Sequence, residues 1–293
     1  MCHRIFAVEG IMTVGLALVA FITLTDRPET ARWLPEEQNQ LAIDRVKSER
    51  LAQSTLLDKI DATKIKRGFA NPITLSTSTV FLLNNITVLG ISFFLPTIIR
   101  TIYPGRTTVQ QQFLTVPPYI VGAFFILVIP TLSWHFNQRQ TFIAITGPTI
   151  IIGYSIFLAT LNANIRYAAV FLCASTTLTL GAMCNAQVSA NVSSDSSRNI
   201  SIGTNAMFGY VGGLIATWTY LPGDAPRYPI GNSINLACAV GWTTLAIATL
   251  FWMKFDNKRR DDRETAVREE VAGLSQREIQ DLEWKHPGWR WKP

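Results

Sequence analysis

The segment Asp26-Arg27-Pro28-Glu29-Thr30-Ala31-Arg32-Trp33-Leu34-Pro35-Glu36-Glu37 opens a hydrophilic stretch that continues to Asn71. This stretch carries nine Lys and Arg residues. One apolar segment of membrane length precedes it, and a long run of further apolar segments follows it. Because a loop of this kind joins two domains, its position so early in the chain leads us to expect that half of the architecture is missing.

Charged residues are strongly segregated along the chain. Between Ile73 and Met253 the charged residues are Arg100, Arg106, Arg139, Arg166, Asp195, Arg198, Asp224 and Arg227. A charge at the centre of a membrane helix costs about 2.5–3.5 kcal/mol. The pattern therefore predicts a multi-span membrane protein whose partner is the lipid bilayer. Basic flanks of membrane helices explain the net charge of +6, so no nucleic acid partner is expected.

Seven stretches reach the roughly 20 apolar residues that a membrane helix needs. They are Ile5–Leu24, Ile73–Ile99, Phe113–Leu132, Phe142–Leu161, Tyr167–Ala190, Ile200–Leu221 and Ile234–Met253. Barrel strands take only about 9–11 residues, and helices satisfy their own backbone in lipid. The predicted fold is an all-α membrane protein with about seven transmembrane helices. Residues 1–25 form one such helix, 26–71 a loop, 72–253 a six-helix half and 254–293 a tail.

The basic residues also predict the orientation. The loop has nine Lys and Arg residues and the tail has ten, and Arg139 and Arg198 fall on the same side. The opposite side receives Arg4, Arg100, Arg106, Arg166 and Arg227. Cytoplasmic flanks are richer in Lys and Arg, so we place the loop and the tail in the cytoplasm and the N-terminus outside. We expect the plasma membrane.

Two short elements are expected outside the spans. In the loop, Pro35 suits a first helical position, and an apolar stripe of Leu41, Ala42, Ile43 and Val46 follows. A brace for the cytoplasmic ends of the bundle and a solvated linker are the two interpretations of this helix, and we favour a mixture of both. In the tail, Ser275–Trp284 is a helical candidate. Gly288–Trp291 suits the membrane interface, although a partly disordered tail is the favoured interpretation.

The histidines and cysteines of this sequence do not form a catalytic or metal-binding motif. His3, His135 and His286 fall at predicted ends or loops, and the four cysteines show no metal-binding spacing. We therefore expect no enzyme activity, no metal and no cofactor.

Uncharged polar residues concentrate instead on three of the predicted spans. An amide in lipid needs a partner, so it faces another helix or a water-filled cavity. Interhelical hydrogen bonding is the simpler interpretation for each residue, but a polar cavity better explains the set. The candidate cavity residues are Asn84, Asn85, Tyr119, Asn185, Gln187 and Asn205. Gly209, Gly212 and Gly213 are candidates for close helix packing or for a hinge.

Acidic residues are absent from the spans, except for Glu9 near an outer end. A proton-coupling carboxylate would then lie outside these seven helices. Since no Lys or Arg lies at mid-membrane either, an anionic substrate would lack a buried counter-charge here.

Several motifs resemble those of fungal major facilitator transporters of the anion:cation symporter group, the allantoate and nicotinate permease relatives. They are Glu9-Gly10-x-x-Thr13, the segment Asp26–Glu37, Gly90-x-x-x-Phe94-Leu95-Pro96-Thr97-Ile98-Ile99, Leu114-Thr115-Val116-Pro117-Pro118-Tyr119, Asn191, Arg198, Gly212-Gly213 and Ala225-Pro226-Arg227-Tyr228-x-x-Gly231. They cover about nine-tenths of the chain in the expected order.

The resemblance implies that the seven spans correspond to helices six to twelve of a twelve-helix fold. Such a fold binds its substrate between two halves near the midplane. The chain departs from the family at Ser133-Trp134-His135, where a gate motif has Asp-Arg, and at Ala186-Gln187-Val188 and Gly209-Tyr210.

Two functional hypotheses follow from the resemblance. The first is transport of small organic anions, either carboxylates or allantoate- or vitamin-like compounds, by alternating access, with a proton as a candidate co-substrate. It treats the chain as truncated, so that an N-terminal half would be needed for a complete carrier. The second is a non-transporting fragment or a membrane protein that depends on a partner. The altered gate motif favours the second hypothesis.

Overall fold

The computed structural model describes residues 2–24, 35–48, 62–263, 282–286 and 288–293. Within these ranges every regular element is helical, which confirms the predicted all-α fold. The chain divides into two compact units, Met1–Leu56 and Leu57–Pro293.

The first unit contains two described helices, α1 (Cys2–Thr23) and α2 (Glu36–Ser48). The large apolar side chains of α1 from Val8 onward are exposed, as suits a helix that presents its surface to lipid. Helix α2 follows Pro35 directly and has Glu36 and Glu37 in its first turn, which confirms the predicted loop helix. Of its apolar stripe, Ile43 is buried while Leu41 is exposed.

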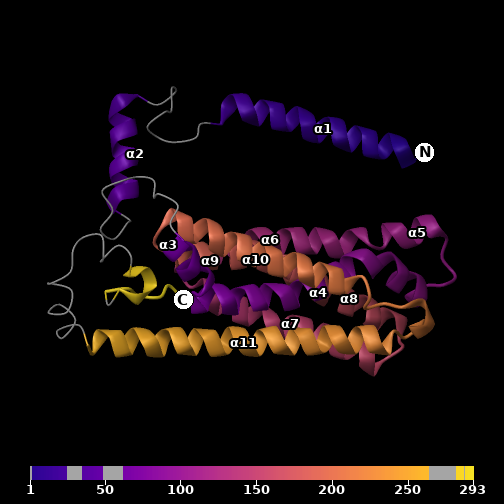
Figure 1. The fold of residues 1–293 in the computed structure, drawn as a ribbon. Coiled ribbons are helices and arrows are strands. Elements are labelled where there is room, and N and C mark those ends of the chain that lie inside the picture. Colours follow the sequence, from indigo (N-terminus) through magenta and orange to yellow (C-terminus); the bar gives the residue numbers. More distant parts are fainter. Residues whose placement is uncertain (1, 25–34, 49–61, 264–281, 287) are drawn as a thin grey trace. The chain divides into compact units, whose positions relative to one another are not determined.

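The second unit is a helical bundle (Figure 1). Its elements are α3 (Ala62–Phe69), α4 (Pro72–Ile102), α5 (Thr108–Phe113), α6 (Val116–Phe136), α7 (Arg139–Ala159), α8 (Ala163–Thr177), α9 (Leu180–Ala190), α10 (Asp195–Ala216), α11 (Pro229–Asp261) and the 3₁₀ turns η2 (Pro222–Asp224) and η3 (Glu283–Lys285). Helix α4 packs against α8, α9, α10 and α11 and is therefore central. The Asn71 side chain caps α4 by accepting from the backbone N–H groups of Ile73 and Thr74.

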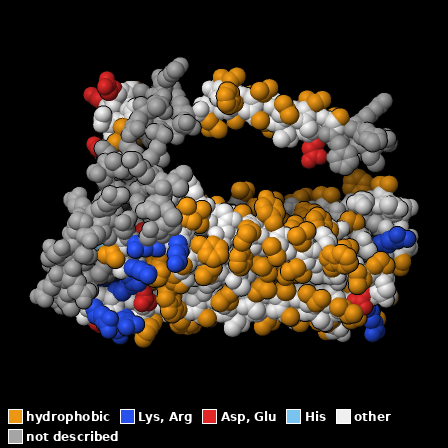
Figure 2. Space-filling model, viewed as in Figure 1, with side chains coloured by type: hydrophobic (Ala, Val, Ile, Leu, Met, Phe, Trp, Pro, Cys, Tyr) orange, Lys and Arg blue, Asp and Glu red, His pale blue; other side chains and the backbone are white. Residues whose placement is uncertain are grey.

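Five helical segments of the described chain are long and apolar enough to cross a membrane. They are Pro72–Ile102, Thr108–Phe136, Arg139–Ala159, Ala163–Ala190 and Pro229–Asp261. Helix α10, where a span over Ile200–Leu221 is expected, starts in a polar segment and ends at Ala216, and it does not meet that threshold. The predicted Ile5–Leu24 span corresponds to the part of α1 over Ala7–Thr23, which is a shorter apolar helix. Figure 2 shows hydrophobic side chains over the middle of the second unit and Lys and Arg toward its ends.

One of the predicted spans is interrupted, and another is preceded by a separate short helix. The predicted Phe113–Leu132 span corresponds to α6, which begins at Val116 with Pro117 and Pro118 in its first turn and follows the short helix α5. The predicted Tyr167–Ala190 span breaks between α8 and α9. There the hydroxyl of Thr177 donates to the Cys173 carbonyl, and that of Thr179 donates to the Thr176 carbonyl at 2.6 Å. Such local bonds compete with a regular helix.

Close packing between helices depends on small residues. A Cβ added at Gly212 of α10 would lie 2.3 Å from the Leu82 carbonyl oxygen of α4. A Cβ added at Gly147 of α7 would lie 2.1 Å from the Thr243 hydroxyl of α11. Two backbones can approach this closely only where one side chain is absent.

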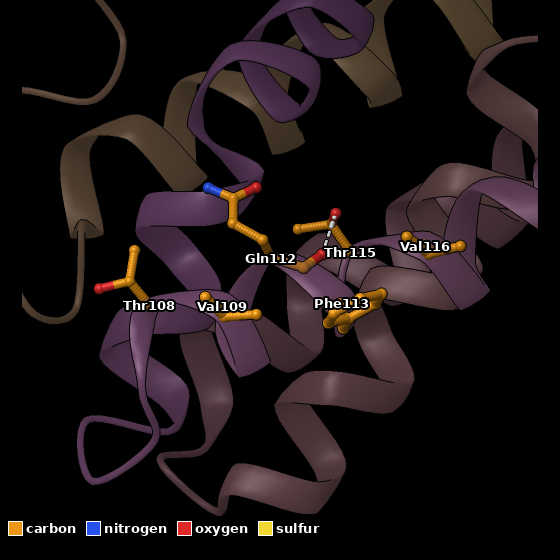
Figure 3. Close-up of a pocket in the computed structure, with 6 residues that line it drawn as sticks. All are labelled: Thr108, Val109, Gln112, Phe113, Thr115 and Val116. Carbon is orange, nitrogen blue, oxygen red and sulfur yellow. Dashed lines mark hydrogen bonds between the residues drawn. The ribbon is translucent and has the colours of Figure 1, made fainter. Parts of the chain in front are cut away.

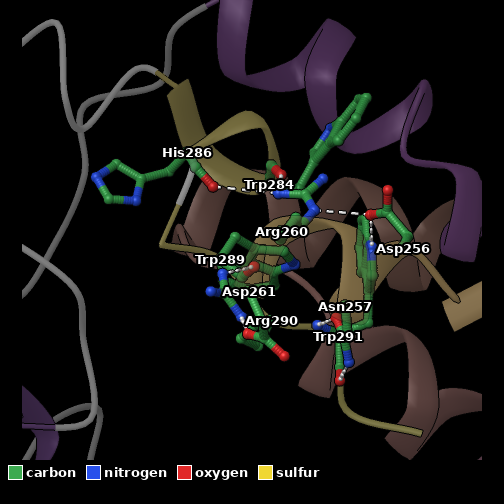
Figure 4. Close-up of polar contacts among 9 residues, drawn as sticks. All are labelled: Asp256, Asn257, Arg260, Asp261, Trp284, His286, Trp289, Arg290 and Trp291. Atoms are coloured by element: carbon green, nitrogen blue, oxygen red, sulfur yellow. Dashed lines mark hydrogen bonds and ion pairs between the residues drawn. The ribbon is translucent and has the colours of Figure 1, made fainter. Parts of the chain in front are cut away.

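Residues 282–286 and 288–293, called here the closing segment, pack against the start of α4 and the later part of α11. Figure 4 shows their polar contacts with side chains of α11. Trp289 and Trp291 are buried with Ile73 and Met253. The Trp291 indole donates to Asp256 at 2.7 Å. The favoured prediction of a partly disordered tail is therefore wrong for these residues, because the buried indoles find both apolar neighbours and a polar partner. Most of the predicted Ser275–Trp284 helix lies outside the described residues.

Side-chain amides clamp the backbone of the closing segment. Asn257 pairs with the N–H and the carbonyl of Trp291 at 2.8 and 2.9 Å. Asn191 pairs in the same way with Lys292 at 2.9 and 3.1 Å. Arg260 of α11 donates to the carbonyls of Trp284 and His286, both at 3.2 Å. The segment thus links α9 to α11 through its backbone.

Replacing Gly212 with Ala tests the close packing of α4 and α10. The new methyl group would overlap the Leu82 carbonyl, so we expect a loss of about 1–3 kcal/mol in the free energy of unfolding. Thermal unfolding of the purified chain in detergent measures it. Gly203→Ala on the same helix is the control, because a Cβ there meets nothing within 4 Å. Equal stability of the two variants would contradict close packing at Gly212.

Replacing Trp291 with Ala tests the docking of the closing segment. Truncating a buried Trp costs about 3–5 kcal/mol, so the segment should separate from the bundle. Hydrogen exchange at the Lys292 amide, which donates to Asn191, should then become fast. Trp134→Ala is the control, since Trp134 is exposed on α6. Unchanged protection at Lys292 in the Trp291 variant would show that the indole does not hold the segment.

Candidate functional site

The structure brings two of the predicted cavity residues together. The buried Asn205 of α10 donates its amide to the Asn185 side-chain oxygen of α9 at 2.8 Å. Asn185 itself is exposed on the surface of the second unit. The pair therefore forms a polar spot that is anchored inside the bundle and open at its surface.

Asn84 and Asn85 are adjacent in α4 but face different neighbours. Asn84 is buried, and its amide lies 3.5 Å from the carbonyl of Thr177, which the break between α8 and α9 frees. Asn85 is partly buried and donates to the Phe81 carbonyl of its own helix at 2.9 Å. A Cβ at Gly209 would lie 3.1 Å from the Asn85 amide nitrogen, which places Asn85 at the contact between α4 and α10.

The three glycines of α10 line this same contact. Gly209 faces Phe81 and Asn85, Gly212 faces the backbone of Leu82, and Gly213 faces Leu89. Each of these neighbours belongs to α4. The glycine face of α10 thus lies beside Asn85.

Gln187 lies apart from these amides, at the closing segment. It is buried, and its amide donates to the Lys292 carbonyl at 3.0 Å. Tyr119 is on α6, half-buried against the core cluster, and within the described chain its hydroxyl makes no hydrogen bond. Among the described residues, neither side chain forms a hydrogen bond with Asn185 or Asn205.

A second polar cluster joins the end of α10 to the start of α11. The Tyr220 hydroxyl donates to Asn232 at 3.2 Å and accepts from Asn235 at 3.3 Å. All three side chains are buried. Sequence reasoning missed this cluster, although two amides three residues apart in an apolar helix mark one helical face. It also missed the burial of Arg166.

Among the described residues, two surface hollows lie away from the predicted cavity residues. One of about 420 Å³ lies along α5 and the start of α6 and is lined by Val109, Phe113 and Val116 together with polar neighbours (Figure 3). The other, of about 350 Å³, lies between the end of α7 and the start of α11. Within the described ranges, no three His, Cys, Asp or Glu side chains gather as a metal site would require.

The chain is similar to several fungal proteins that are named as transporters. An uncharacterized transporter of Schizosaccharomyces pombe is 26% identical over 265 residues, or 88% of this chain and 51% of that protein. The high-affinity nicotinic acid transporter of Saccharomyces cerevisiae is 26% identical over 258 residues, or 87% and 47%. The major facilitator-type transporter hxnP of Emericella nidulans is 26% identical over 295 residues, or 98% and 57%.

The chain spans about half the length of these curated relatives. No solved structure matches it significantly. The family model of the Major Facilitator Superfamily matches residues 3–217, which is more than half of the chain. Together with the apolar helices of membrane length, this match shows an integral membrane protein. The chain belongs to the major facilitator superfamily.

Proposed function

We propose that this chain takes part in the transport of small organic anions, with carboxylates as the substrate class, by alternating access. The superfamily and the transporter names of its relatives support membrane transport. One relative is named as a transporter of nicotinic acid, which is a carboxylate, and this name supports the substrate class. The resemblance to the anion:cation symporter group also supports an organic anion as the substrate.

The exposed amide of Asn185 is the observation that carries the proposal. It lies within the apolar segment Ala163–Ala190, where contact with lipid would leave polar atoms without partners. Asn205 fixes it from behind with one hydrogen bond. An amide held in this way is suited to face a water-filled cavity and to bind a carboxylate through its free N–H group. Asn85 extends the polar surface along the contact between α4 and α10.

The proposal includes a membrane arrangement. Helix α1 corresponds to the sixth helix of the superfamily fold, and the second unit supplies the seventh to twelfth. Residues 26–71 and the tail face the cytoplasm and the N-terminus faces outside, in the plasma membrane, as the basic residues favour. A proton that accompanies the substrate would need a titrating group outside the spans of the second unit, because these carry no mid-membrane Asp or Glu.

A second candidate function is that of a membrane protein that depends on a partner and does not transport. The observation that favours it is the sequence Ser133-Trp134-His135 at the end of α6, where the family has an acidic and a basic residue in a gate motif. Trp134 and His135 cannot form the ion pair that such a gate would use. Measurement of uptake separates the two candidates.

Uptake of labelled nicotinic acid tests the proposal. Yeast cells that lack their own nicotinic acid transporter would express the full chain, alone or together with the N-terminal half of the Saccharomyces cerevisiae relative. We expect uptake in at least one of these strains. Asn185→Ala should lower that uptake by about tenfold, the effect of losing one charge-assisted hydrogen bond to the carboxylate.

Gln112→Ala is the matched control, because Gln112 is an exposed amide on α5 outside the polar surface. Its uptake should equal that of the unchanged chain, at equal protein levels in the membrane. Absence of uptake of nicotinic acid and of other small carboxylates in both strains would favour the non-transporting candidate. Equal uptake by the Asn185 variant and the unchanged chain would remove Asn185 from the site.

A further inference from the structure

Arg166 is a buried cation for which the described part of the chain provides no acidic partner. It lies in the first turn of α8 and is only 3% exposed. Its Nε atom has no hydrogen-bond partner, and within the described residues no carboxylate forms an ion pair with it. A guanidinium group stays protonated, so it does not escape the cost of burial by losing its charge. A buried charge of this kind calls for a compensating anion.

The surroundings of Arg166 add positive charge. Its guanidinium lies 5.7 Å from the centre of the Phe157 ring, a contact that offsets part of the cost of burial. Arg227 lies within electrostatic reach of it, and the N-terminus of α8 carries a partial positive charge. Asp224, the acidic residue of the nearby η2 turn, accepts from the backbone N–H of Ile230 at 3.0 Å. Asp224 keeps its charge, but Arg166 and Arg227 together outweigh it, so the described residues here carry a net positive charge.

A hollow bordered by Arg227 and by Phe157, the ring that contacts Arg166, is large enough for a small anionic group. Its volume is about 350 Å³, and its walls include Phe157, Thr160, Arg227 and Pro229. Phe157 thus borders the hollow and also contacts the Arg166 guanidinium. Pro229 is the first residue of α11, so a helix N-terminus also borders the hollow.

We propose that Arg166 and Arg227 form an anion site for a phosphate group at this end of the bundle. Arginine pairs with phosphate oxygens through parallel N–H groups, and burial strengthens the pair. The ends of membrane helices lie at the level of lipid headgroups, so the phosphate comes either from an anionic phospholipid or from free phosphate. The site lies apart from Asn185 and Asn205 and is independent of the transported substrate.

Thermal unfolding of the full chain in phosphatidylcholine nanodiscs tests this site. One arm adds phosphatidylglycerol to the lipid, and another adds inorganic phosphate to the buffer. We expect one of these to raise the unfolding temperature of the unchanged chain. Native mass spectrometry should show that Arg166→Gln binds the effective anion about tenfold more weakly, as expected for the loss of a charge-assisted contact. Stabilisation by phosphatidylglycerol alone identifies a lipid, and stabilisation by phosphate alone identifies a soluble anion.

The difference in stability between Arg166→Gln and the unchanged chain should change sign when the anion is added, and this separates anion binding from a purely structural role. Without an added anion, Arg166→Gln should be at least as stable as the unchanged chain, because it removes an uncompensated buried charge. With the anion, the variant should be the less stable of the two. Arg106→Gln is the control, since Arg106 is an exposed arginine in a loop of the same unit. The proposal is overturned if neither anion stabilises the unchanged chain. It is also overturned if the effective anion raises the unfolding temperature of the Arg166 variant as much as that of the unchanged chain.

Discussion

Close contact between the backbones of α4 and α10 is the constraint on which the polar surface of this protein depends. Gly212 allows α10 to approach the Leu82 carbonyl, and Gly209 leaves room for the Asn85 side chain. The same helix then holds Asn205 within reach of Asn185 on α9. Because lipid offers no hydrogen bonds, larger residues along α10 would separate these helices and leave amides without partners.

Hydropathy predicted most of the helical architecture because length and apolar content decide whether a segment can cross a bilayer. It did not predict the break between α8 and α9. There the hydroxyls of Thr177 and Thr179 bond to their own backbone, an effect that average hydropathy does not contain. Burial of the closing segment was also missed. The apolar and polar partners of Trp291 are contributed by distant parts of the chain, such as Ile73 and Asp256.

The candidate site was predicted only in part, for a related reason. Residue type shows that an amide in lipid needs a partner, but it does not show which partner. Asn185 and Asn205 do meet, whereas Gln187 binds the backbone of the closing segment. The burial of Arg166 was not foreseen, since its position near a predicted helix end suggested contact with water. Its surroundings combine Phe157 of α7 with Arg227, which comes much later in the sequence.

The amide clamps at Asn191 and Asn257 have a consequence for the order of assembly. Both clamps bind backbone atoms of the closing segment, and their amides come from the C-terminal cap of α9 and from α11, which are separated by the whole of α10. The segment can therefore dock only after α9 and α11 have been inserted and packed. Before that step its tryptophans lack their burial site and are open to chaperones and to the quality-control machinery. Docking of the closing segment would thus mark the completion of the bundle during its biosynthesis.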